Sequence, residues 1–207
     1  MSTGSFEMPK APMDITPARF FGEWLPAQVE PFKPLIQAMA GDIAFTMAIK
    51  VTGDGGGEWT VKLAGGKLEV VPGLDPAALV TLALSEKNFV QAVTGQLDDL
   101  RMQPQGLPKG GLTPEIIKQQ AQKNIEALTQ IHGLMEFHAE DPQRPFMVGI
   151  KFAGPMKDQA DCVIKMDQED IRSMVKGETN PQAAFMSGKI RIEGDMGLLM
   201  QLAPLMM

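Results

Sequence analysis

Apolar and polar residues alternate along much of this chain, and this period of two predicts half-buried strands. In the run from Ile43 to Val51, for example, Phe45, Met47 and Ile49 alternate with Thr46, Ala48 and Lys50. Further strands are predicted at 59–63, 67–71, 79–84, 134–138, 146–152, 162–166 and 190–193. Glycine-containing turns at 54–57 and 65–66 join the first three strands, which is a hairpin signal.

Between these strands, other segments show the spacing and end signals of helices. One is expected after Pro31 or Pro34 up to Gly41, one from Ser85 as N-cap to Gly95, and one from Thr113-Pro114 through Ile131. Two more are expected before Gly177 and after Asp195, the latter residue serving as N-cap. Residues 1–30 carry four prolines with little periodicity, and we expect a loosely docked arm with one helical turn near Ala18 to Trp24. The pattern as a whole predicts an α+β protein.

Composition narrows the class of protein. The chain has 207 residues, 44% hydrophobic and 21% charged, which is typical of a globular protein with a substantial core. Its net charge of -6, without a basic run, argues against nucleic acid as a partner. A single cysteine and the lack of a signal-like start or a membrane-spanning stretch favour a cytoplasmic location. Sixteen methionines suit either an adaptable core or the wall of a ligand site.

The last third of the chain carries a recognisable order of motifs. A strand from Cys162 and a helix to Gly177 are followed by Asn180-Pro181-Gln182-Ala183-Ala184-Phe185, then Gly188-Lys189, a strand, and Gly194-Asp195-Met196-Gly197-Leu198. This order resembles the sterol carrier protein type-2 domain family. The resemblance implies a curved, mainly antiparallel sheet covered by helices around an apolar tunnel that holds sterols, fatty acids, acyl-CoAs or other lipids.

The first half of the chain resembles the same family in its hairpin, in Gly66-Lys67-Leu68-Glu69-Val70, and in the strand and helix that end at Gly95. Residues 80–95 and 162–177 align without gaps, and Val93/Val175 and Gly95/Gly177 are identical. We therefore infer a diverged internal duplication. The expected organisation is an arm (1–30), a first half (31–103), a linker (104–112) and a second half (113–207). The first half lacks the closing strand and the second lacks one hairpin arm, so we expect a pseudo-dimer in which each covers the other's missing edge.

The resemblance and the alternation together suggest where a ligand would lie. We expect apolar residues of the last helices and strand to form the wall, and by resemblance the terminal helix to cover the tunnel. The candidate lipid-binding residues are Met174, Phe185, Met186, Ile190, Ile192, Met196, Leu199, Met200 and Leu202. The expected function is non-catalytic binding and transfer of a lipid or other apolar small molecule, with transient membrane contact.

No catalytic or metal-binding motif stands out, and no cofactor is expected. His132 and His138 are the only histidines and lack ligand spacing, while Cys162 shares a strand face with Ile164 and Met166, as a buried, inert thiol would. Two alternatives stay open. One is an enzyme that uses the tunnel for an apolar polyketide-type or terpenoid-type substrate, and the other is an accessory subunit that presents lipids to membrane enzymes.

Overall fold

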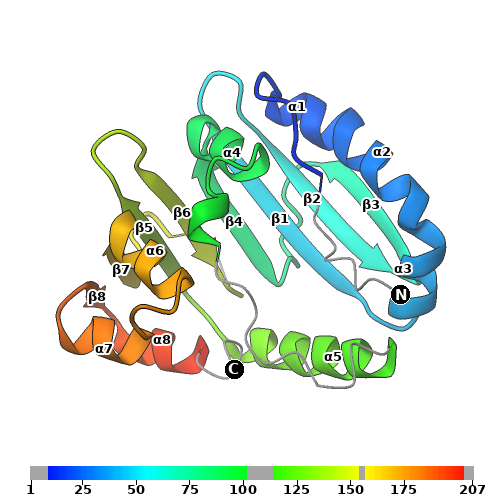
Figure 1. The fold of residues 1–207 in the computed structure, drawn as a ribbon. Coiled ribbons are helices and arrows are strands. Elements are labelled where there is room, and N and C mark those ends of the chain that lie inside the picture. The colour runs from blue at the N-terminus through cyan, green and yellow to red at the C-terminus, as the bar shows by residue number, and fades with distance from the viewer. Residues whose placement is uncertain (1–8, 102–113, 154–156, 203–207) are drawn as a thin grey trace, which may run out of the picture.

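The computed structural model describes residues 9–101, 114–153 and 157–202, and it contains one curved sheet of eight strands. Their order in the sheet is β3-β2-β1-β4-β6-β5-β7-β8 (Figure 1). The strands are β1 (Phe45–Thr52), β2 (Gly57–Ala64), β3 (Lys67–Pro72), β4 (Val80–Ser85), β5 (Leu134–Glu140), β6 (Phe146–Lys151), β7 (Cys162–Asp167) and β8 (Ile190–Gly194). The predicted α+β class and curved sheet are confirmed.

The helices follow the predicted capping signals closely. Ser85 caps α4 by accepting a hydrogen bond from the Asn88 amide, and the Asp195 side chain accepts one from the Gly197 amide at the start of the terminal helix. The longer helices are α3 (Lys33–Ala40), α4 (Glu86–Val93), α5 (Pro114–Gln130), α6 (Gln168–Val175), α7 (Pro181–Met186) and α8 (Met196–Leu202). Thr113, the predicted cap of α5, lies outside the described residues.

The two halves of the chain repeat one topology. In the first half, β1 pairs antiparallel with β2 and parallel with β4. In the second half, β5 pairs antiparallel with β6 and parallel with β7. Val80 and Cys162, which begin β4 and β7, are 82 residues apart, and so are Glu86 and Gln168, which begin α4 and α6. The duplication inferred from the gapless alignment therefore has a structural counterpart, element by element.

Strand β6 joins the halves, and it does so in a particular register. In the second half, β8 closes the sheet by pairing antiparallel with β7, and Ile192 lies opposite Ile164. In the first half, β6 takes the same place beside β4, and Ile150 lies opposite Leu82, which is 82 residues before Ile164. The hairpin arm of the second half thus serves as the closing strand that the first half lacks. The predicted pseudo-dimer with mutually covered edges is confirmed.

The N-terminal arm differs from the expectation. Three short segments, α1 (Pro17–Arg19), a π-helical turn η1 (Phe20–Trp24) and α2 (Leu25–Val29), continue through a 3-10 turn η2 (Glu30–Phe32) into α3. Phe21 is buried and stacks on Trp59 of β2, with ring centroids 4.7 Å apart. The expected helical turn near Ala18 to Trp24 is present, but the helical part of the arm is longer than expected and is docked through Phe21. Pro17, Pro26, Pro31 and Pro34 permit this because they lie in the first two positions of successive helical segments, where a missing N–H costs little.

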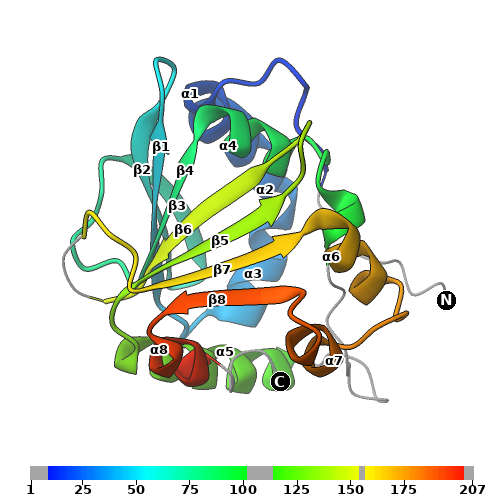
Figure 2. The same ribbon diagram turned by 90° about the vertical axis from the view of Figure 1, so that its left-hand side faces the viewer.

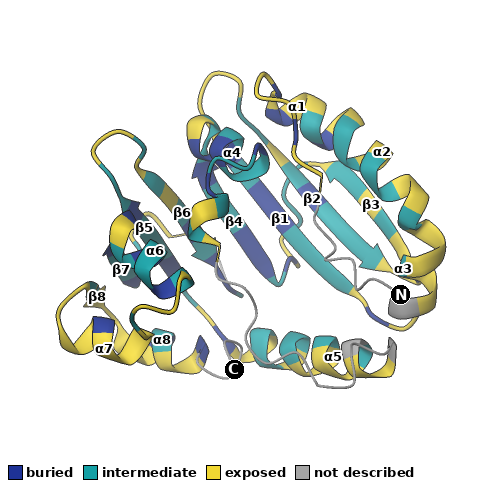
Figure 3. Cartoon of the chain, in the orientation of Figure 1, coloured by how far each residue is buried: buried dark blue, intermediate teal, exposed yellow. Residues whose placement is uncertain are grey.

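The helices bury one face of the sheet. Register brings apolar residues of neighbouring strands into line on this face: Ile49, Leu82, Ile150, Met135 and Cys162. Burial is deepest around β1 and β4 in the middle of the sheet (Figure 3). Helices α5 and α8 both lie along the lower edge of the molecule, where they follow one another in Figure 1 and overlap in the view from the β8 side (Figure 2). Among the described residues, no helix is long and apolar enough to cross a membrane.

Candidate functional site: an apolar cavity in the first half

A cavity of about 630 Å³ lies between the N-terminal helical segments, α4 and the β2–β3 hairpin. Aromatic and aliphatic side chains dominate its lining. On the helical segments these are Phe20, Trp24, Leu25, Val29, Phe32, Leu35 and Ile36, and on the hairpin and α4 they are Leu63, Leu68, Ala92 and Val93. This volume is within the roughly 300–1,000 Å³ of small-molecule sites. The cavity can therefore take an apolar molecule of lipid size.

The structure shows how the sequence holds this wall in place. Phe20 stacks on Trp24 at 5.0 Å and meets Phe89 of α4 edge to face at 5.2 Å, and both contacts fix the π-helical turn against the core. Ahead of the helix, the Ala11 amide donates to the Val93 carbonyl and docks the chain on the end of α4. The wall is thus assembled from the N-terminal arm and from α4 of the first half.

Two cationic side chains, Lys10 and Arg101, also line the cavity. Both are mostly exposed, and both contact Asp98: Lys10 Nζ lies 2.5 Å from Oδ2, and Arg101 Nε lies 3.3 Å from Oδ1. Gln28 is the other polar residue of the lining. Because the charges lie at the solvent side of an otherwise apolar space, this end suits the polar end of an amphiphile.

The 3-10 turn η3 (Asp98–Leu100) that carries this charged end is tied to the second half. The Asp99 carboxylate accepts hydrogen bonds from Arg172 (2.7 Å) and Arg144 (3.0 Å). Partial burial pushes the pKa of Asp99 upward, but the hydrogen bonds from Arg172 and Arg144 outweigh it and hold the pKa below its ordinary value. Gln168 is buried and accepts from both arginines. The second half therefore supports the cavity without lining it.

None of the nine residues predicted to bind lipid lines this cavity. Phe185, Met186, Met196 and Met200 are exposed on α7 and α8, with Met186 at 79%. The other five pack into the second half: Met174 and Leu202 are buried, and Ile190, Ile192 and Leu199 are half-buried against the same clusters. The structure thus packs these five against apolar neighbours of the second half.

Reactive groups lie elsewhere in the chain. Cys162 is buried in β7, and burial, followed by the nearby Asp195 carboxylate, raises the pKa of its thiol, as expected of an inert cysteine. His138 forms a side-chain hydrogen bond with Glu136, two residues earlier on the same face of β5. Within the described part of the chain, no group of three or more His, Cys, Asp or Glu residues could hold a metal ion.

One sequence pattern that marks the cavity wall was not among those used for prediction above. Phe20, Trp24, Gln28, Phe32 and Ile36 recur at every fourth position, which is a helical spacing, and all of them line the cavity. The four prolines of residues 1–30 and Pro31 and Pro34 hid this stripe, because prolines argue against a continuous helix.

Comparison with known proteins agrees with the fold. The model of the SCP-2 sterol transfer family matches residues 28–106 and again residues 115–207. Human hydroxysteroid dehydrogenase-like protein 2 is 32% identical over 132 residues, which is 60% of this chain and 32% of that protein. Rat sterol carrier protein 2 is 30% identical over 148 residues, 64% of this chain and 27% of that protein. The chain thus spans about a third or less of the length of these relatives.

Among solved structures, sterol carrier protein domain 2 of Helicoverpa armigera matches with a TM-score of 0.31 and 25% identity, over 43% of this chain and 77% of that one. Sterol carrier protein 2 like 2 of Aedes aegypti matches with a TM-score of 0.30 and 15% identity, over 43% of this chain and 98% of that one. Because the family model matches both halves, the chain belongs to the SCP-2 sterol transfer family, and it carries two copies of the domain.

Proposed function

We propose that this protein binds an apolar lipid, such as a fatty acid, acyl-CoA or sterol, in the first-half cavity and transfers it without catalysing a reaction. The observation that carries the proposal is the apolar cavity of about 630 Å³ in a chain of the SCP-2 sterol transfer family. Relatives named sterol carrier protein 2 support it.

The chemistry of the cavity favours a carrier over an enzyme. Among the described residues, its lining contains no His, Cys, Asp, Glu, Ser or Thr, so this part of the wall offers none of the usual nucleophiles and few general acids or bases. Lys10 and Arg101 are the ionisable side chains in the described part of the lining. The alternative is an enzyme that acts on an apolar substrate; relatives named hydroxysteroid dehydrogenase-like protein 2 match this chain over about a third of their own length.

The energetics are suited to reversible binding. Burying an acyl chain contributes about 0.8 kcal/mol per CH₂, or on the order of 12 kcal/mol for a chain of about sixteen carbons. Association costs of roughly 4–15 kcal/mol offset much of this gain. A carboxylate or phosphate at the charged end would meet Lys10 and Arg101, which Asp98 neutralises only in part. Met186 and Met200 are both exposed and offer an apolar surface for a transient membrane contact.

The test is to purify the protein natively, weigh the intact complex by native mass spectrometry, and identify extracted lipids. The expected result is that the intact protein is heavier than its sequence mass, and that the difference equals the mass of a lipid recovered in the organic extract. A protein that carries no lipid, and that also fails to bind a fluorescent C16 fatty acid, would refute the carrier function. Turnover of a bound apolar compound during incubation would favour the enzyme alternative.

A further inference from the structure

The duplication lets each residue of the first-half cavity be compared with its counterpart in the second half. Ala92 on α4 lines the cavity, and the residue 82 positions later is Met174 on α6. Met174 is 6% exposed and packs in a cluster with Met166, Ile171 and Ala184. Where the first half has a small side chain and open space, the second half has a long side chain in contact with its neighbours.

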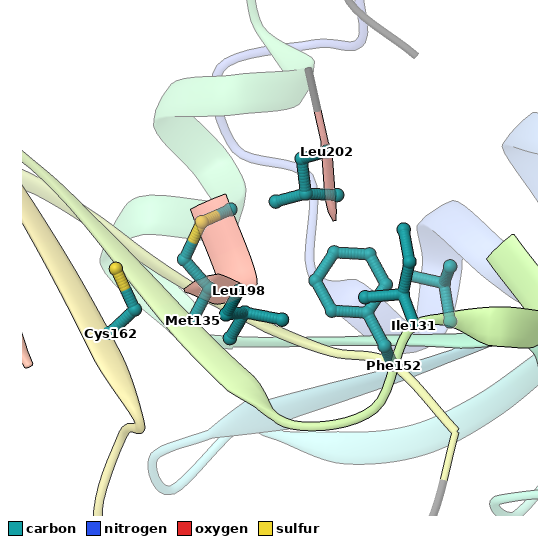
Figure 4. Packing of buried hydrophobic residues seen from close by; sticks show 7 residues of the cluster. Ile131, Met135, Phe152, Cys162, Leu198 and Leu202 are labelled. Carbon is teal, nitrogen blue, oxygen red and sulfur yellow. The ribbon is translucent and has the colours of Figure 1, made fainter. Parts of the chain in front are cut away.

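The terminal helix fills a further part of the second half. Leu198 and Leu202 of α8 are 1% and 8% exposed, and they pack with Ile131, Met135 and Phe152. Figure 4 shows Leu198 beside Met135 and Leu202 facing the ring of Phe152. In the described part of the first half, no helix corresponds to α8. The apolar face of the second half is therefore covered by its own chain.

The second half retains a supporting role in this arrangement. Its strand β6 closes the first half's sheet beside β4, and its Arg144 and Arg172 hold Asp99, which is adjacent to the charged end of the cavity. These contacts explain why a copy with a filled interior would still be needed for binding.

We infer that the two copies have divided their roles: the first half, with the N-terminal arm, holds the ligand, one per chain, and the second half is a closed copy that supports it. This inference rests on the proposed function and adds to it the number and place of the ligands. Ala92 is then a residue that sets the capacity of the site, because a larger side chain there would take up cavity space as Met174 does in the second half.

The experiment titrates the full-length protein with palmitate by isothermal calorimetry, and counts bound ligands by native mass spectrometry. Wild type is expected to bind one palmitate per chain. Ala92→Met is expected to bind at least ten-fold more weakly, while Lys87→Met, the same new side chain at an exposed position of α4, changes affinity by less than two-fold. Ala92→Met extends into open space, so its thermal unfolding midpoint is expected to stay close to that of wild type.

A methyl NMR titration places the ligand independently. With carbon-13 methionine methyl labels, Met135, Met166 and Met174 of the buried second-half clusters are expected to keep their chemical shifts when palmitate binds. Two palmitates per chain, unchanged affinity in a folded Ala92→Met, or direct broadening of those three methyl signals by a spin-labelled fatty acid would overturn the division of roles. If wild type bound no palmitate or other lipid, the proposed function itself would fail.

Discussion

Truncating Leu198 tests whether α8 is a part of the core or a mobile cover over a ligand. Leu198 is 1% exposed and packs with Ile131, Met135, Phe152 and Leu202. Leucine-to-alanine changes at such sites cost about 2.7–5.0 kcal/mol, from lost transfer free energy and from the cavity that remains. Taking about 3 kcal/mol, and about 2–4 °C per kcal/mol for a chain of this size, we expect Leu198→Ala to lower the thermal midpoint by about 6–12 °C.

The assay follows urea unfolding by circular dichroism and by tryptophan fluorescence together. Trp24 of the N-terminal arm and Trp59 of the first half are the only tryptophans, and the second half has none. Because β4 and β6 join the halves into one sheet, a change in α8 is expected to shift both signals to the same lower midpoint. Palmitate affinity of the folded variant is expected to stay within two-fold of wild type.

Met200→Ala is the matched control on the same helix. Met200 is 68% exposed, so its truncation is expected to change unfolding free energy by less than about 0.5 kcal/mol. The reasoning fails if Leu198→Ala costs less than about 1 kcal/mol, or if the circular dichroism midpoint falls while the fluorescence midpoint does not. The second result would mean that the halves unfold independently.

Three further predictions concern polar and thiol groups. Gln168→Leu removes the acceptor of Arg144 and Arg172 and the donor to the Arg144 carbonyl, so chemical denaturation should show a loss of about 2–3 kcal/mol; a loss below 0.5 kcal/mol would contradict this. The Asp161 carboxylate accepts hydrogen bonds from Lys157 and from the Leu134 amide, and these lower its pKa from the ordinary value of 3.8. The ionised carboxylate therefore stabilises the fold at pH values above 3.8, and this stabilisation is lost as the pH falls through the lowered pKa of the folded protein. Asp161→Asn should therefore flatten the acid limb of a stability-against-pH curve, and an unchanged curve would refute the assignment. Cys162 should react with a thiol reagent far more slowly in the native protein than in urea, and equal rates would show that the core opens readily.

Much of the fold could be predicted from the sequence because each strand buries one face, and that face appears as alternation. Ile190 and Ile192 face the core while Arg191 and Glu193 face water, as the pattern indicated. The starts of two helices could be predicted equally well, because Ser85 and Asp195 cap them through hydrogen bonds to residues two or three positions away. The pairing of β4 with β6 joins residues about seventy positions apart, and it was predictable only because the two copies lacked complementary strands.

The cavity that we propose as the ligand site was harder to predict, because open space depends on small side chains at a few positions and leaves no pattern in the sequence. Helix patterns mark Met174 and Ala92 alike as inward-facing, and only their sizes and packing show that one fills space and the other leaves it. The assignment of the wall to the second half rested on the clearer family motifs there. Those motifs specify the fold of the second half, whereas the volume of the cavity depends on side-chain size at a few positions of the first half, such as Ala92.

The central claim is that a lipid occupies the first-half cavity, and photo-crosslinking tests it most directly. A C16 fatty acid with a diazirine near its methyl end would be bound to the full-length protein, irradiated, and mapped by peptide mass spectrometry. We predict labels on residues 20–36, 63–68 and 92–93, competed by unlabelled palmitate. Competed labels confined to residues 174–202, the region first assigned as the wall, would contradict the account.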